Sequence, residues 1–295
     1  MKVKLLYVAS FCLLAFLVAC NNPRQQSGND RGDDDQVTGF YNSNLSNESK
    51  DLKEAEKELP SKNTSSHVTM MEIPAPLKDR PEQILKRTGF TISYNKARRV
   101  PNWVAWHLTK SHTYGSAKRN NEIFMPDEAV PSPRATDNDY YNSRYDRGHL
   151  CPAGDNKWSN DAMRESFLFT NTCPQNHGLN KDAWNDLEIQ CRQWAREYGS
   201  VDIVTGPIFY GRGEQKTIGR NKVWVSDAFF KVVLCRKGTP KALGFIYQNR
   251  GGSQRMSDCV CTVDEVEELT GIDFFPSLAD HIEDKVEAKA RLADW

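Results

Sequence analysis

Short apolar runs alternate with longer amphipathic stretches from about residue 90 onward. Residues 90–95 and 102–108 alternate apolar and polar positions as half-buried strands do, and a polar turn at 96–101 separates them. Apolar runs at 167–170, 201–205, 223–234 and 242–247 predict further buried strands. Strands interrupted by a few helices are typical of an α+β domain, so we expect a mostly antiparallel central sheet.

Helical periodicity is strongest between residues 181 and 198. Apolar side chains recur there among charged ones, at Trp184, Leu187, Ile189, Cys191 and Trp194. Polar residues at the start of 159–166 suit the cap of a short helix, and 263–271 predicts another helix that ends at a glycine. The last residues predict either a helix or a frayed tail, so helices should flank the sheet.

The beginning of the chain has the pattern of an export signal. Lys2 and Lys4 precede an apolar run of about 15 residues, shorter than the ~20 needed to span a membrane. The run ends in Leu17-Val18-Ala19-Cys20, which resembles the lipobox of bacterial lipoproteins, although a cleaved signal with a chance cysteine is an alternative. We therefore expect an exported lipoprotein, lipidated at Cys20 and anchored to the membrane at the periplasmic face or the cell surface.

The predicted organisation is a signal peptide at 1–20, a flexible polar tether at 21–72 and one domain at 73–295. The tether has too few apolar residues to offset the entropy lost on ordering. Lys plus Arg and Asp plus Glu number 39 each in the whole chain and stay nearly balanced in the domain. Overall charge therefore does not identify a nucleic-acid-binding protein, and a local basic cluster would have to do so.

The domain contains six cysteines, at 151, 173, 191, 235, 259 and 261. In an exported protein these are compatible with disulfides, although the sequence does not choose among the possible pairings. The Cys259-Val260-Cys261 spacing differs from that of zinc knuckles, so a zinc site is not expected there.

Asp146-Arg147-Gly148-His149 combines four groups suited to phosphate chemistry. The His149 imidazole titrates near neutral pH and can accept a proton from water, whereas Arg147 keeps its charge and offers planar donors to phosphate oxygens. Gly148 would let the backbone bend between them. The alternative interpretation is a surface loop in which the Asp and the Arg pair and the histidine is partly buried.

Further polar residues follow downstream. Asn180 precedes the long amphipathic helix, and Glu188 and Arg192, four residues apart, share one of its faces. Taken alone, Asn180 is typical of a helix N-cap and the Glu–Arg pair of a solvated ion pair.

Several of these motifs occur in an order that resembles the DNA/RNA non-specific endonuclease family, within the ββα-metal (His-Me finger) superfamily. The resemblance extends from about residue 90 to 247. It rests on Asn102-Trp103-Val104-Ala105-Trp106, Arg119, Asp146-Arg147-Gly148-His149, Thr170-Asn171 with Pro174-Gln175, Asn180 with Trp184, and Leu187-Glu188 with Arg192.

The resemblance implies a role for each matching residue. It implies a ββα-metal motif in which His149 is the general base and Asn180 the protein ligand to one Mg²⁺, with Mn²⁺ as a possible substitute. Glu188 would orient water beside the metal, and Asn171 would position the catalytic network. Arginines would bind substrate phosphates, namely Arg147, Arg192 and Arg119, the last in a loop whose length differs from the family pattern.

The implied activity is Mg²⁺-dependent hydrolysis of phosphodiester bonds in DNA and RNA, giving 5′-phosphate products. Two alternatives remain open at this stage. One is a non-catalytic surface protein that captures nucleic acid, and the other is a phosphodiesterase acting on small nucleotides. A chelator separates the first alternative from the nuclease, and a series of oligonucleotide lengths separates the second.

Overall fold

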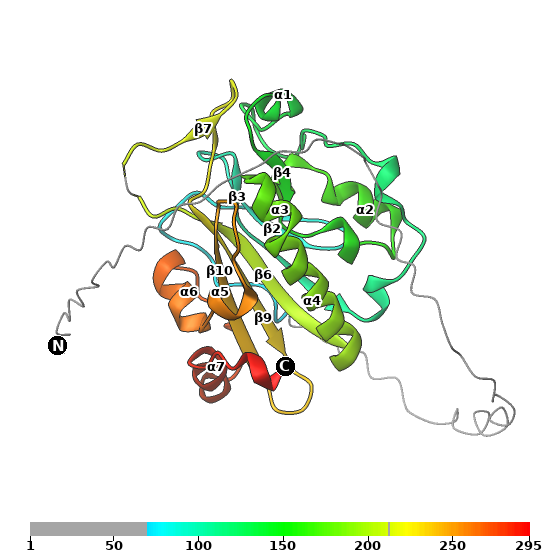
Figure 1. The fold of residues 1–295 in the computed structure, drawn as a ribbon, viewed down its shortest axis with the longest axis vertical. Helices are drawn as coiled ribbons and strands as arrows, with labels where there is room; N and C mark the ends of the chain where they lie inside the picture. The colour runs from blue at the N-terminus through cyan, green and yellow to red at the C-terminus, as the bar shows by residue number, and fades with distance from the viewer. Residues whose placement is uncertain (1–69, 212) are drawn as a thin grey trace, which may run out of the picture. The chain divides into compact units, whose positions relative to one another are not determined.

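A computed structural model describes residues 70–211 and 213–295 (Figure 1). The predicted signal peptide, Cys20 and nearly all of the predicted tether lie outside these described residues.

The core of the domain is a seven-stranded sheet in which every neighbouring pair of strands is antiparallel. Its strand order is β1 (Gln83–Lys86), β2 (Thr91–Asn95), β3 (Val100–Thr109), β6 (Ser200–Ile208), β9 (Ala228–Cys235), β10 (Lys241–Gln248) and β11 (Val260–Cys261). The predicted α+β class with a mostly antiparallel sheet is confirmed.

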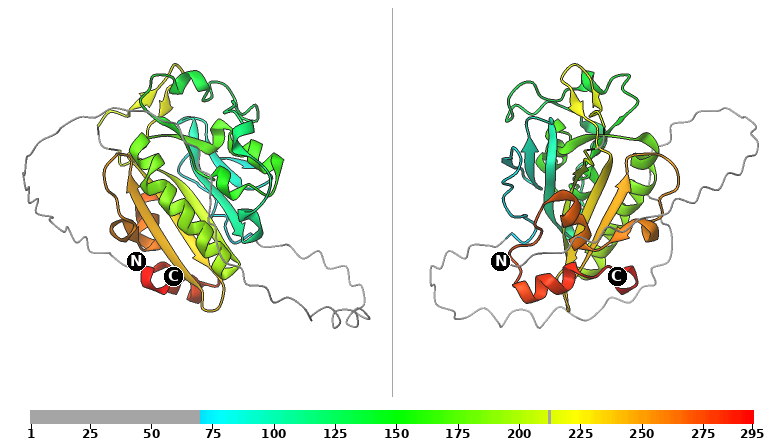
Figure 2. Two further views of the ribbon diagram at one scale, coloured as in Figure 1. Left: turned by 45° about the vertical axis from the view of Figure 1, so that its right-hand side comes forward. Right: turned by 90° about the vertical axis from the view of Figure 1, so that its left-hand side faces the viewer.

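Helices cover both faces of this sheet (Figures 1 and 2). The long helix α4 (Ala183–Tyr198) packs on one face, and α6 (Val263–Thr270) and α7 (Asp280–Glu287) pack on the other. Strand β9 is buried throughout because it contributes alternate side chains to both layers. Phe229 and Val233 face α4, whereas Phe230 and Val232 face α6, which explains the continuous apolar run in the sequence.

Two smaller two-stranded sheets lie outside the main one. They pair β4 (Asp146–His149) with β5 (Thr172–Gln175) and β7 (Thr217–Ile218) with β8 (Val223–Trp224). The remaining α-helices are α1 (Asp137–Tyr140), α2 (Asn160–Ser166), α3 (His177–Lys181) and α5 (Met256–Cys259). Short 3-10 helices occupy Ser111–Thr113, Arg119–Asn121, Ala153–Asp155, Phe169–Asn171 and Leu292–Asp294.

Three predicted elements differ from the structure. The run at 223–234 is two strands, because the backbone leaves β8 after Trp224 and enters the main sheet only at Ala228. Residues 167–170 were expected to form a strand but lead into the 3-10 helix Phe169–Asn171. The helix expected from residue 181 is interrupted at Asp182, which separates α3 from α4.

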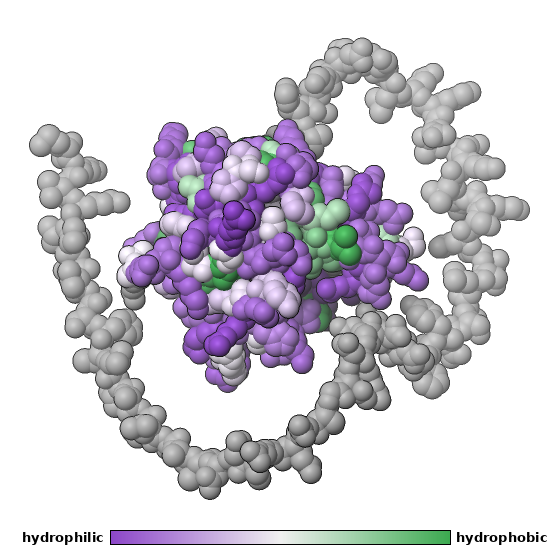
Figure 3. Space-filling model, turned by 90° about the horizontal axis from the view of Figure 1, so that it is seen from above, coloured by the Kyte–Doolittle hydropathy of each residue, from purple (hydrophilic) through white to green (hydrophobic). Residues whose placement is uncertain are grey.

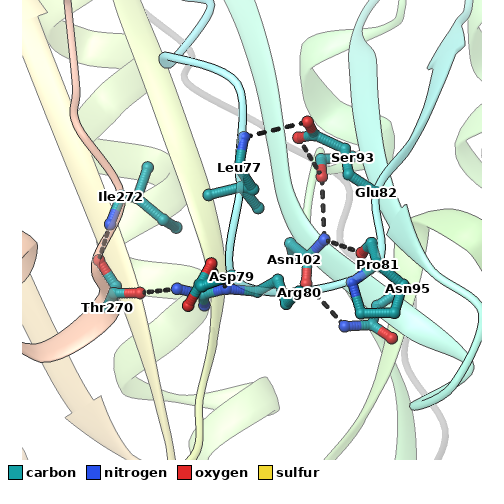
Figure 4. A network of polar contacts seen from close by, with 10 residues as sticks. All are labelled: Leu77, Asp79, Arg80, Pro81, Glu82, Ser93, Asn95, Asn102, Thr270 and Ile272. Atoms are coloured by element: carbon teal, nitrogen blue, oxygen red, sulfur yellow. Dashed lines mark hydrogen bonds and ion pairs between the residues drawn. The ribbon is translucent and has the colours of Figure 1, made fainter.

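A polar network fixes the first described segment to the sheet (Figure 4). Glu82 accepts hydrogen bonds from the backbone of Leu77 and from Ser93, and Asn102 donates to Ser93 at 3.0 Å. Arg80 donates to the carbonyl oxygen of Thr270 at the end of α6. The segment before β1 is therefore held between β2, β3 and α6.

All six cysteines of the domain are free thiols in the structure, so the expected disulfides are not confirmed. Cys151, Cys173, Cys191 and Cys235 are buried in the core that α4 shares with the sheet, where they pack as small apolar side chains. Among the described helices, none combines the length and the apolar character needed to cross a membrane.

Candidate active site

The Asp-Arg-Gly-His motif forms the strand β4, which pairs antiparallel with β5. Gly148 lies opposite Cys173, and a Cβ atom at Gly148 would approach Oε1 of Gln175 to 2.4 Å and its Cβ to 2.5 Å. The predicted flexible joint is therefore wrong. Gly148 is a strand residue, and its missing side chain makes room for Gln175. Helices α3 and α4 follow β5 directly, which gives the expected ββα arrangement.

His149 lies at the end of β4 between two aromatic rings. Its ring centroid is 5.0 Å from that of Phe124 and 4.8 Å from that of Phe167, which meets it edge-on. The buried Nε2 atom has no hydrogen-bond partner among the described residues. Burial, assisted by the positive charge of Arg119, lowers the pKa of His149 to about 3. The imidazole is therefore neutral at physiological pH, the form that can accept a proton.

Arg147 shares a face of β4 with His149, because alternate strand residues point the same way. Its guanidinium carbon lies 5.9 Å from the centroid of the Phe124 ring and 5.8 Å from that of Tyr140. Arg147 pairs with Asp137 of α1 at 2.6 Å, and not with Asp146 as the surface-loop interpretation supposed. The pair is partly exposed, so an anionic substrate could replace the Asp137 carboxylate.

Asp146 connects β4 to the helix that carries the expected metal ligand. Its Oδ2 atom accepts a hydrogen bond from Nδ2 of Asn180 at 2.9 Å and lies 2.9 Å from Nδ1 of the exposed His177. Asn180 lies inside α3, whose N-cap is Asn176, so the N-cap interpretation of Asn180 is wrong. With its amide nitrogen held by Asp146, its Oδ1 atom accepts no hydrogen bond from the described residues.

Glu188 lies in the second turn of α4, in a charged environment. Burial raises its pKa to about 7, while the positive charges of Lys231, Arg192 and Arg119 oppose that rise. Lys231 is fully buried in β9 on the α4 side of the sheet, and its Nζ atom has no hydrogen-bond partner within the described chain. That Nζ lies 4.5 Å from the Trp184 ring centroid, a cation–π contact with the same helix.

Arg192 forms an ion pair with Asp155, and not with Glu188. Its Nη1 atom donates to Oδ1 of Asp155 at 3.0 Å, and Oδ2 of the same carboxylate accepts from Nε1 of Trp106 at 3.0 Å. Asp155 is buried and Arg192 is mostly buried. The guanidinium is thus fixed in orientation while its charge still acts on Glu188.

Arg119 and Asn171 occupy different positions relative to this site. Arg119 is exposed on a 3-10 helix, and its positive charge acts on both His149 and Glu188. Asn171 is buried and bonds only to backbone, accepting from Cys151 N and donating to the carbonyls of Cys151 and Ser166. It holds the chain just after His149, which agrees with a positioning role.

The predicted site residues thus lie on adjoining elements: Arg147 and His149 on β4, Asn180 on α3, and Glu188 and Arg192 on α4. The charge of Arg119 acts on His149 and Glu188. Sequence reasoning missed the supporting residues Asp155 and Lys231 and assigned no role to Phe124 or to the contact between His177 and Asp146. Of these residues, Lys231 could have been suspected from the sequence, because it is a single charged residue within the apolar run of β9. The contacts of the others depend on tertiary packing.

Comparisons with known proteins agree with this geometry. The chain is 36% identical over 207 residues to the mouse protein "Nuclease EXOG, mitochondrial", an alignment of 65% of this chain and 56% of the relative. It is 31% identical over 209 residues to human "Endonuclease G, mitochondrial", covering 66% of this chain and 70% of that protein. The chain thus spans little more than half the length of the first of these relatives.

A solved structure shares the fold. The crystal structure of the EndoG/EndoGI complex matches with a TM-score of 0.67 and 27% identity, covering 75% of this chain and 95% of the matched chain. The model of one family, described as DNA/RNA non-specific endonuclease, matches residues 69–281. The chain therefore belongs to the DNA/RNA non-specific endonuclease family.

Proposed function

We propose that this protein is a metal-dependent endonuclease that hydrolyses phosphodiester bonds in both DNA and RNA. The observation that carries the proposal is the hydrogen bond between Asn180 and Asp146, which joins the expected metal ligand to the strand of His149. Neutral His149, the amide oxygen of Asn180 and three arginines would then supply a base, a metal ligand and phosphate contacts for hydrolysis of a phosphodiester.

His149 is the proposed general base. Its neutral imidazole would remove a proton from the attacking water, and the rings of Phe124 and Phe167 hold it in one orientation. Asn171 fixes the backbone beyond it through Cys151, so the imidazole is positioned from both sides.

Asn180 fits the chemistry of a Mg²⁺ ligand, with Mn²⁺ as a possible substitute. Its amide nitrogen is occupied by Asp146, which leaves the carbonyl oxygen for a hard cation. When bound, the ion would supply positive charge that stabilises the leaving 3′ oxygen. Glu188 would hold water beside it, and the charges of Lys231 and Arg192 favour the carboxylate form that this role needs.

Arg119, Arg147 and Arg192 are the proposed phosphate contacts. Contacts with phosphate fix position and carry no sequence information, so they suit an enzyme that accepts both nucleic acids and any sequence. Seen from the end of the domain where α1 and β7 lie, the surface is mostly hydrophilic (Figure 3), which is compatible with a charged substrate. By analogy with the family, the products would carry 5′-phosphates.

Digestion of plasmid DNA and of a structured RNA tests the proposal. We expect internal cleavage of both in Mg²⁺ or Mn²⁺ and none in excess EDTA. Binding of nucleic acid without cleavage in Mg²⁺ would instead support a capture protein. Cleavage restricted to dinucleotides would support the small-nucleotide phosphodiesterase.

Export and lipidation at Cys20 complete the proposal. They rest on the basic, apolar and Leu17–Cys20 pattern of the sequence. We expect the native chain to fractionate with membranes and a Cys20→Ala variant to leave them. An unchanged membrane fraction in that variant would contradict the anchor.

A further inference from the structure

Helices α6 and α7 lie on the face of the sheet opposite α4 (Figure 1). Three carboxylates from these two helices meet there. One oxygen atom from each of Asp264, Glu267 and Glu287 lies within 4.8 Å of the others. Asp264 and Glu267 lie on α6, and Glu287 is the last residue of α7. The proposed nuclease residues lie around β4, α3 and α4, so this cluster is a separate feature.

The buried carboxylate of Glu287 has an oxygen atom that a bound cation would stabilise. Glu287 is only 6% exposed, and its buried Oε1 atom has no hydrogen-bond partner among the described residues. A buried carboxylate oxygen without a partner is costly, since it has lost water and gained nothing in return. Glu283, one turn earlier on α7, also has a buried Oε1 without a partner.

The charges that act most strongly on Glu267 and Glu287 are negative. Asp264, Asp273 and Glu283 all act on Glu267, and the same three residues act with Glu267 on Glu287. Like charges held this close together repel one another, so a cation placed among them would be stabilised.

We propose that Asp264, Glu267 and Glu287 bind a divalent cation, Ca²⁺ in preference to Mg²⁺, which ties α7 to α6. Hard oxygen ligands without histidine or cysteine select such ions over zinc. A cage of several carboxylates suits Ca²⁺, which takes six to eight oxygens, better than Mg²⁺, which retains most of its waters. The family match ends at residue 281, and Glu287 lies beyond it.

Thermal unfolding with added CaCl₂ tests the proposal, using a full chain that carries Asn180→Ala to weaken the nuclease site. We expect Ca²⁺ at about 100 times its Kd to raise Tm by roughly 5 °C, and MgCl₂ to raise it less. Isothermal titration with CaCl₂ should give one binding event. The Glu267→Gln/Glu287→Gln variant should lose both effects, and the exposed Asp264→Asn variant should bind more weakly.

Glu268→Gln is the matched control, because it removes one exposed carboxylate from the same helix outside the cluster. It should keep the full Ca²⁺ response. The proposed site would be overturned if Ca²⁺ neither raised Tm nor bound in the Asn180→Ala chain. It would also be overturned if Glu267→Gln/Glu287→Gln in that chain gave an equal rise in Tm and equal binding. Neither result depends on cleavage, so the nuclease proposal stands or fails separately.

Discussion

The side-chain amide of Asn180 donates a hydrogen bond to the carboxylate of Asp146, with 2.9 Å between Nδ2 and Oδ2. This contact joins α3 to β4, the strand that ends at His149. A ligand amide held in this way presents its oxygen in a fixed direction, as residues behind metal ligands commonly ensure. The carboxylate of the Asp-Arg-Gly-His motif thus orients the proposed metal ligand.

Replacing Asp146 should weaken metal use more than it weakens the fold. We expect Asp146→Ala to raise the Mg²⁺ concentration for half-maximal plasmid cleavage by about 10–100-fold, because Asn180 loses its partner. The matched control is His177→Ala, since His177 contacts the same oxygen but is largely exposed. It should change that concentration by less than about twofold. Equal effects of the two variants would contradict this role of Asp146.

A side chain at Gly148 should separate β4 from β5. The Cβ of Gly148→Ala would overlap the Gln175 side chain, so we expect a loss of about 1–3 kcal/mol in the free energy of unfolding. Gly251→Ala is the control, because its Cβ would meet nothing closer than 3.3 Å. Urea unfolding followed by circular dichroism measures both variants. Equal stability of Gly148→Ala and the parent chain would contradict the packing argument.

Lys231 should lower the pKa of Glu188 through its charge. We expect Lys231→Met to raise the Glu188 pKa above about 7 and to shift the pH profile of cleavage to higher pH. The fold should persist, because methionine fills similar space and removes a buried amine that has no hydrogen-bond partner.

NMR titration of the glutamate side chains would follow the Glu188 pKa directly. Lys241→Met is the control, because that lysine lies over the rings of Tyr198 and Trp295 and not among the groups that act on Glu188. A Glu188 pKa unchanged by Lys231→Met would contradict the coupling.

The acidic cluster should make stability depend on pH when divalent ions are absent. In the folded chain, the pKa values of Glu267 and Glu287 lie near 7 and 8, above the ordinary 4.5, because of burial and the neighbouring Asp264, Asp273 and Glu283. The folded state therefore binds more protons than the unfolded state between about pH 5 and 8, so stability falls as pH rises.

Thermal scans in EDTA should show this as a fall in Tm on the order of 5 °C over that range. Glu267→Gln/Glu287→Gln should flatten the curve, whereas Glu268→Gln should leave its slope unchanged. A parent Tm that rises with pH across this window would contradict the interpretation.

The sequence predicted elements best where apolar periodicity was long and local. Strands β2, β3, β6 and β10 and helices α2, α4 and α6 lie close to their predicted positions, and Ser159 caps α2 as expected. The sequence does not predict the division between β8 and β9, because Trp224 and Phe229 are both large aromatic residues in one apolar run. Asp227, between the two strands, bonds through its backbone to Ile208 and Asn249, which only the folded chain brings near.

In the candidate site, the sequence motifs identified residues that could act on a substrate. They did not identify the residues that hold those side chains in position. Asp155 lies 37 residues before its partner Arg192, and no local pattern connects the two. Glycine often permits the backbone to bend, so the sequence predicts a flexible joint at Gly148. In the structure, a residue without a side chain is needed there because Gln175 approaches the backbone closely. Such contacts arise from tertiary packing.

Cleavage of supercoiled plasmid in Mg²⁺ by His149→Ala, compared with the parent chain and with exposed His281→Ala, tests the central claim most directly. We expect a loss of at least about 100-fold in rate for His149→Ala with an unchanged circular dichroism spectrum, and parental activity for His281→Ala. Near-parental cleavage by folded His149→Ala would contradict the assignment of His149 as the general base.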